Sequence, residues 1–209
     1  ASMKSEGAQF IIAQMHWGIE YQLEEADYQD EMAQKLCDLG VNAIIGGHPH
    51  CEQPIDVLDT SDGSGHMFCI YSEGNALSNQ RTYLMDEMPT GHTEDGVMVT
   101  LTLHQNSDGS VEIKDVDLLP TWVYRYQDND GSKYYILPLD DVENLEKTTG
   151  ISDIQQEAQD SYDRTMEELG SGLEKAKQIF GGSSVSTATA DNKTSNTGIG
   201  SGLMNLGVE

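Results

Sequence analysis

The sequence predicts an α/β protein, and three observations carry that prediction. Residues 10–15 and 41–45 are short apolar runs with the length and composition of buried strands. The segment between them has the spacing of an amphipathic helix, so strand, helix and strand follow one another as in a parallel sheet. Each run ends in a loop that carries histidine, and strand ends are where open α/β sheets build their sites.

The first helix is expected between the two strands. Asp27 is a suitable capping residue, and Gly40 is a typical helix end. Apolar side chains recur between them at helical spacing, at Tyr28, Met32, Leu36 and Leu39.

Beyond the second strand the chain predicts further strands, and later a helix. Residues 67–71 form another apolar run, and the alternating patterns that follow, at 97–103, 111–116, 122–126 and 133–137, are typical of half-buried strands. Asp, Asn and Gly at 106–109 and 128–131 predict two hairpin turns. From Leu139 a helical pattern follows, with one apolar face that we expect to pack on the core, formed by Ile154, Ala158, Tyr162, Met166 and Leu169.

Composition excludes some partners. The chain has 209 residues and a formal net charge of -25, so its surface repels nucleic acid and anionic lipid. No run approaches the roughly 20 apolar residues of a membrane helix, and residues 1–7 have no signal-peptide core.

Three cysteines are too few, and odd in number, for a disulfide framework. Cys51 and Cys69 could approach each other, because one follows His50 and the other lies in the next apolar run. Ordinary buried thiols are the simpler interpretation for both.

Three histidines mark the ends of the first two strands. His16 follows the first run directly, and His48 and His50 follow the second after two glycines. Two residues this close cannot point the same way from a straight strand, but they can converge on a loop distorted by Gly and Pro. A single histidine at such a place is more often a hydrogen-bonded loop residue. Three at two strand ends favour a metal site, since neutral imidazole suits Zn, Mn and Fe.

Several short motifs resemble those of the bacterial poly-gamma-glutamate capsule biosynthesis family (capsule synthesis protein A type), which is related to the calcineurin-like metallophosphoesterases. The motifs are His16-Trp17-Gly18 with Glu20-Tyr21, Gly46-Gly47-His48-Pro49-His50 with Gln53-Pro54, Tyr71-Ser72-Glu73-Gly74-Asn75, and Pro120-Thr121-Trp122-Val123 with the run at 135–139. The resemblance covers residues 8 to 145.

The resemblance implies part of a four-layer α/β/β/α sandwich over residues 1–145. A helical appendage would follow at 146–180, and then a loose tail rich in Gly, Ser and Thr at 181–209. It implies two divalent metal ions, with His16 and His48 as ligands of one and His50 as a ligand of the other. The residues expected to line the substrate pocket are Trp17, Gly18, Glu20, Glu73 and Asn75. At Glu73 the family usually has leucine.

Other ligands of the superfamily are not matched. An Asp-containing motif, a bridging aspartate and the Asn-His motif that supplies a general acid all precede the stretch that this sequence matches, so we expect the chain to represent the carboxyl-terminal half of a catalytic domain. Three neutral imidazoles cannot balance two divalent charges. The nearby carboxylates, at Glu20, Glu52, Asp56 and Glu73, match no bridging motif.

Two functions follow as hypotheses. The first is a metal-dependent phosphoesterase-like protein of capsule synthesis, inactive as this fragment alone and situated at the extracellular face of the membrane or the cell surface. The second is a non-catalytic binding or structural subunit of a surface polymer assembly, with an incomplete metal site. The expected partners are the amino-terminal half of the same domain or a second copy of the chain, and an acidic or phosphate-bearing polymer precursor. An unpaired sheet edge would favour such association.

Overall fold

Two β-sheets and four α-helices make up residues 2–181, the part of the chain that this computed structural model describes. The helices are α1 (Ser2–Ser5), α2 (Asp27–Asp38), α3 (Leu145–Thr149) and α4 (Gln155–Phe180), with single 3-10 turns η1 (Thr82–Leu84), η2 (His92–Glu94) and η3 (Val142–Asn144). The strands are β1 (Ile12–His16), β2 (Ala43–Gly47), β3 (Glu52–Asp59), β4 (His66–Glu73), β5 (Asp95–Gln105), β6 (Val111–Asp128) and β7 (Gly131–Pro138). Apart from Gly181, the tail predicted at 181–209 lies outside the described residues.

The first sheet has the strand order β1-β2-β4-β3. β1, β2 and β4 are parallel, and α2 connects β1 to β2, which confirms the predicted strand, helix and strand unit. β3 runs antiparallel to β4 and was not predicted. Its sequence begins with Glu52, Gln53 and Pro54, which is an unusual start for a buried strand.

The second sheet is an antiparallel meander of β5, β6 and β7. Both predicted hairpin turns are present, and Gly109 adopts φ +89° in the first of them. The two strands predicted at 111–116 and 122–126 are one continuous strand, β6, which passes through Pro120. Pro120 lies one residue before Thr121, which pairs with the last residue of β7. Its carbonyl oxygen accepts from the Leu139 N–H at 2.9 Å, and it has no N–H to return the bond, so the proline stands where this ladder ends.

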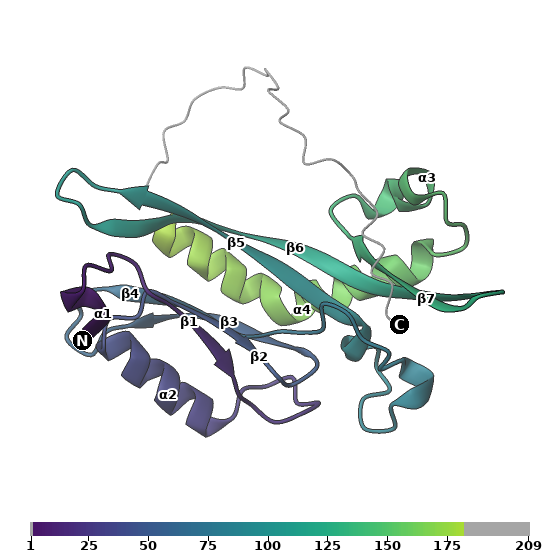
Figure 1. Ribbon diagram of the computed structural model, residues 1–209, viewed down its shortest axis with the longest axis horizontal. Helices are drawn as coiled ribbons and strands as arrows, with labels where there is room; N and C mark the ends of the chain where they lie inside the picture. The colour runs from purple at the N-terminus through teal and green to yellow at the C-terminus, as the bar shows by residue number, and fades with distance from the viewer. Residues whose placement is uncertain (1, 182–209) are drawn as a thin grey trace, which may run out of the picture.

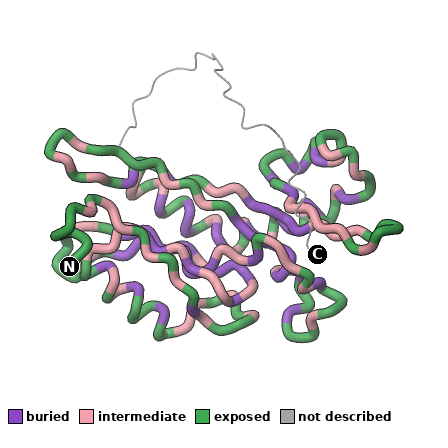
Figure 2. The backbone as a smooth tube through the Cα atoms, viewed as in Figure 1, coloured by how far each residue is buried: buried purple, intermediate pink, exposed green. Residues whose placement is uncertain are grey.

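The elements are layered around a core between the two sheets. In Figure 1, α2 covers one face of the first sheet, and α4 lies between that sheet and the second. The core joins side chains from both sheets, such as Phe68, Ile70 and Val116, to Leu169 and Leu173 of α4. Figure 2 shows the same buried stretches of sheet and helix. The mixed α/β architecture with two sheets and a C-terminal helix agrees with the predicted fold class.

Helix α2 forms where it was predicted, but its cap and its buried face differ. Ala26 is the N-cap, and its N–H donates to Gln29 Oε1 at 2.9 Å, so Asp27 is the first helical residue. The buried side chains are Gln29, Ala33 and Cys37, whereas the predicted face is largely exposed. Gln29 is buried because its Nε2 donates to Gln53 Oε1 at 3.0 Å, an interaction that local periodicity cannot indicate.

Helix α4 packs closely on β3 through a glycine. A Cβ placed on Gly172 would lie 2.1 Å from the carbonyl oxygen of Ile55, so only glycine permits this approach. Of the predicted face, Ile154, Ala158 and Leu169 are buried. Together α3 and α4 occupy the stretch that was predicted as a helical appendage.

The three cysteines, Cys37, Cys51 and Cys69, are free and buried. No helix within residues 2–181 combines the length and the apolar character needed to cross a membrane.

Candidate metal centre

The three histidines lie together at the carboxyl ends of β1 and β2. His16 is the last residue of β1 and pairs with Gly47, the last residue of β2, in parallel register. The N–H of Trp17 donates to the carbonyl oxygen of Gly47 at 3.0 Å, which keeps the two loops side by side beyond the strands. Because parallel neighbours end at the same edge, the loop that carries His48 and His50 emerges beside His16.

The distances between the rings separate His50 from His16 and His48. The ring centroids of His16 and His48 are 4.5 Å apart, and those of His48 and His50 are 6.4 Å apart. An imidazole bound through one nitrogen has its centroid about 3.2 Å from the ion, so two rings on one tetrahedral ion have centroids about 5 Å apart. The rings of His16 and His48 are close enough to face one ion, and the ring of His50 lies farther from His48.

The backbone around the histidines is strained. His48 and His50 have φ values of 117° and 61°, and Tyr21 has 63°. Residues with a side chain rarely adopt positive φ, and such outliers cluster at functional sites. The Tyr21 N–H donates to Pro49 O at 2.8 Å, and its ring stacks on His50 with centroids 5.9 Å apart. These contacts turn the loop so that both imidazoles leave it near His16.

The nearby carboxylates do not complete the centre. Within residues 2–181, no group of three or more His, Cys, Asp or Glu side chains is arranged to hold one ion. Glu52 is fully buried, Glu20 is exposed, and Asp56 binds Lys175 Nζ at 2.5 Å. Burial raises the pKa of Glu73, which is half-buried at the end of β4.

Two of the predicted pocket residues have packing contacts. Trp17 is 5% exposed, and its Nε1–H donates to Tyr71 O at 2.8 Å within the core on the α2 side of the sheet. Gly18 has φ +93°, and its N–H donates to the hydroxyl oxygen of Tyr28. A Cβ on Gly18 would lie 2.8 Å from Pro49 Cγ, so glycine lets the β1 loop pass under the histidine loop.

Asn75 contacts a histidine directly. Its Oδ1 lies 3.0 Å from His50 Nδ1, and its Nδ2 donates to the carbonyl oxygen of His50 at 3.1 Å. Gln80, which the sequence analysis did not single out, accepts from Asn75 Nδ2 at 3.0 Å and donates through Nε2 to the Tyr21 hydroxyl at 2.9 Å. Gln80 lies in a loop without periodicity, so no local pattern could have identified it.

Two buried carboxylates bind α4, and the sequence analysis did not single out the first of them. Asp95 accepts from Ser161 Oγ at 2.6 Å and from Arg164 Nε at 2.7 Å. Glu52 accepts from Thr165 Oγ1 at 3.0 Å, while its Oε2 has no partner in the described structure. Burial raises the pKa of Glu52 well above its usual range. Through these contacts α4 is joined to β3 and β5, whose first residues flank the loop of Asn75.

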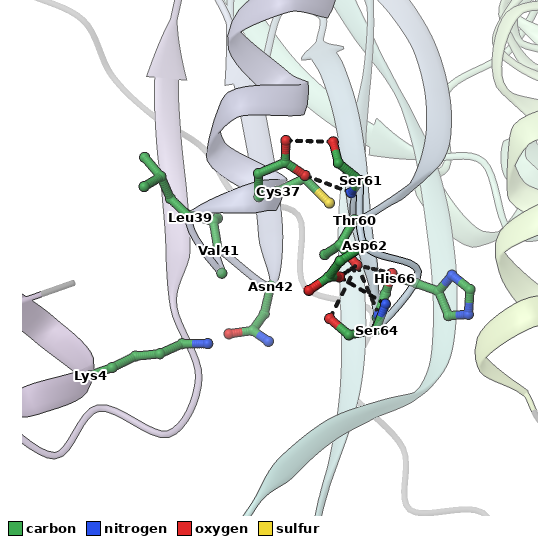
Figure 3. Close-up of a pocket in the computed structure, with 13 residues that line it drawn as sticks. Lys4, Cys37, Leu39, Val41, Asn42, Thr60, Ser61, Asp62, Ser64 and His66 are labelled. Atoms are coloured by element: carbon green, nitrogen blue, oxygen red, sulfur yellow. Dashed lines mark hydrogen bonds between the residues drawn. The ribbon is translucent and has the colours of Figure 1, made fainter.

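Two surface cavities lie away from the three histidines. The cavity in Figure 3 has a volume of about 570 Å³ and lies at the amino-terminal ends of β2 and β4, beside the turn at 60–65. A second cavity, of about 840 Å³, lies between α2 and β3. The three histidines line neither of them, so cavity shape does not locate the candidate centre.

The two sheets, with α2 connecting the parallel strands β1 and β2 of the first, are consistent with a metallophosphoesterase-like α/β fold. Residues 1–80, which include all three histidines, match the family model described as bacterial capsule synthesis protein PGA_cap. Over these residues the chain is similar to that family.

Curated relatives show a similarity that extends beyond residues 1–80. The chain is 31% identical over 111 residues to the PGA biosynthesis protein CapA of Bacillus subtilis (strain 168), which covers 53% of the chain and 26% of that protein. It is 29% identical over 110 residues to the capsule biosynthesis protein CapA of Bacillus anthracis, which covers 53% of the chain and 23% of that protein. The matched part is thus about a quarter of each relative.

Proposed function

We propose that this chain supplies the histidine ligands of a two-metal phosphoesterase site that serves capsule biosynthesis, with poly-gamma-glutamate as the capsule polymer. The observation that carries the proposal is the convergence of His16, His48 and His50 at one sheet edge, inside the part that matches the capsule synthesis family. The names of the curated relatives support the role in capsule synthesis. By the same similarity, the protein acts at the cell surface.

The roles proposed for the histidines are those that the family resemblance implies, and their spacing supports them. His16 and His48 hold one divalent ion, and His50 holds a second. When bound, such ions polarise a phosphoryl oxygen and lower the pKa of a coordinated water. The chain orients the rings through the strained loop and through Asn75.

A partner segment supplies the carboxylate that bridges the ions and the general acid. The edge of the first sheet supports this part of the proposal, because β1 pairs only with β2 among the described strands and Ile12 is 55% exposed on it. Such an edge accepts a further strand. The amino-terminal half of the same domain is the partner proposed here, and a second copy of the chain is the alternative that light scattering would detect.

The test is metal analysis and turnover of the chain, alone and combined with that half. Alanine is placed at His16, His48 or His50, and His104→Ala, at an exposed histidine on β5, is the matched control. His16→Ala and His48→Ala should each remove the first ion and leave the second, His50→Ala should remove the second, and the control should keep both. Hydrolysis of a phosphodiester or phosphomonoester substrate should fall with each site variant.

Two outcomes would contradict the proposal. If the combined protein binds no metal and hydrolyses neither ester, the site is not a phosphoesterase centre. If the variants lose metal but capsule formation persists in cells, the chain is a structural subunit of the assembly.

A further inference from the structure

We propose that Asn75 is a positioning residue that holds the His50 ring in a single tautomer, with the proton on Nδ1 and the lone pair of Nε2 free for a metal ion. The part of this inference that concerns metal rests on the proposed function. The part that concerns the ring can be tested without any metal.

The surroundings of Asn75 determine which way its amide faces. The side chain is buried, and its Nδ2 lies 3.1 Å from the carbonyl oxygen of His50 and 3.0 Å from that of Thr93. Backbone carbonyls only accept hydrogen bonds, so the atom that faces them must be the NH₂ group. The reverse orientation would place an amide oxygen against two carbonyl oxygens and leave all three unsatisfied.

The orientation of the amide then determines the tautomer of His50. With Nδ2 fixed, Oδ1 is the atom 3.0 Å from His50 Nδ1. An amide oxygen cannot donate, so Nδ1 must carry the hydrogen. In the neutral ring Nε2 then has the free lone pair, which is the form that binds a metal ion. Ligating histidines in proteins are commonly oriented by such a hydrogen bond from the second ring nitrogen.

Further contacts keep Asn75 in place. Its backbone N–H donates to Asp95 O at 2.9 Å, and the preceding residue, Gly74, forms an isolated bridge with Gly96. A Cβ on Gly74 would lie 2.7 Å from Asp95 O, so glycine is required for this approach. The loop of Asn75 is therefore attached to the start of β5.

Gln80 completes the arrangement around the ring. It accepts from Asn75 Nδ2 and donates to the Tyr21 hydroxyl, and the Tyr21 ring stacks on His50. His50 is thus held through Nδ1 and through one face of its ring. Among residues 2–181, no side chain or backbone group binds Nε2 of this ring.

The first experiment is a long-range ¹H–¹⁵N spectrum of the histidine-labelled, metal-free chain, at a pH where the His50 ring is neutral. His50→Gln assigns the signals. We expect the Nδ1–H tautomer in the wild type and loss of that preference in Asn75→Ala. Asn79→Ala is the matched control, because Asn79 lies in the same loop, is exposed, and its side-chain oxygen accepts from the Tyr134 hydroxyl at 2.8 Å, away from His50. A wild-type ring in the Nε2–H form would overturn the proposal, whether or not any variant folds.

The second experiment is titration of Zn²⁺ into the metal-free proteins. Asn75→Ala should weaken binding about 10- to 100-fold, and Asn79→Ala should leave it unchanged. Equal Zn²⁺ affinity in the wild type and Asn75→Ala would overturn the positioning role while leaving the metal site intact. A wild type that binds no Zn²⁺ even when combined with the amino-terminal half would instead overturn the proposed function, and the tautomer would then decide the role of Asn75.

Discussion

Gly172→Ala should destabilise the protein, although alanine is the better helix former. A Cβ at this position would lie 2.1 Å from Ile55 O and 2.8 Å from Ile55 C, and both atoms belong to the backbone of β3 rather than to a flexible side chain. Replacing a helical glycine by alanine gains about 1 kcal/mol of helix stability. Overpacking of a buried contact costs about 3 kcal/mol at the upper end of the usual range, which is appropriate for a rigid neighbour. The net loss is about 2 kcal/mol, or a fall in Tm of about 4 to 8 °C for a chain of this size.

Gly170→Ala is the matched control in the same helix. The only neighbour of its Cβ would be Met166 Cε at 3.5 Å, which is an ordinary contact, so this variant should gain stability by up to about 1 kcal/mol. Urea and thermal unfolding, followed by tryptophan fluorescence, give both values. If Gly172→Ala is as stable as Gly170→Ala, then α4 does not contact β3 as described here.

Three further predictions concern the first sheet, helix α2 and the turn after β3. Gly46→Ala should lower the free energy of unfolding by about 1 to 3 kcal/mol and weaken Zn²⁺ binding, because its Cβ would lie 2.0 Å from Tyr71 O. Gly47→Ala is the control, since its Cβ would enter open space and should change neither property. Equal results for the two variants in thermal unfolding and Zn²⁺ titration would contradict this prediction. The three cysteines should not react with a thiol reagent in the native chain and should all react in urea, since they are buried and burial raises their pKa values. Fast labelling of the native chain would contradict the buried positions described for them. Hydrogen bonds from the Ser61 N–H and hydroxyl lower the pKa of Asp38 below 3.8, so the stability that they contribute is present above that pH and is lost as pH falls through the folded-state pKa. Faster hydrogen exchange of the Ser61 amide at low pH should follow, after correction for its intrinsic rate, and Asp38→Asn should remove this dependence.

Local patterns were sufficient for much of the fold. Apolar runs located β1, β2 and β4, and the Asn and Gly residues of the hairpins located both turns of the second sheet. The histidines could be placed together for the same reason, since residues that directly follow parallel neighbouring strands emerge at one edge. This inference needed no knowledge of which residues meet across the core.

What the sequence did not predict depends on contacts between distant residues. β3 was missed because Glu52 and Gln53 are polar in sequence and buried in the structure, where they bind Thr165 and Gln29. The prediction of the buried face of α2 was wrong for the same reason. Asn75 could be associated with the site by resemblance, but its contact with the His50 ring depends on loops that come together only after both sheets have formed.

The attachment of α4 has a consequence for synthesis on the ribosome. Leu169, Leu173 and Ala176 fill the space between the sheets, and Arg164 is the ionic partner of Asp95. A nascent chain that has emerged as far as residue 150 therefore contains the strands of both sheets, but it lacks the apolar side chains that fill the core and the arginine that pairs with Asp95. We expect such intermediates to stay open and to need protection from chaperones until the last helical turns have emerged.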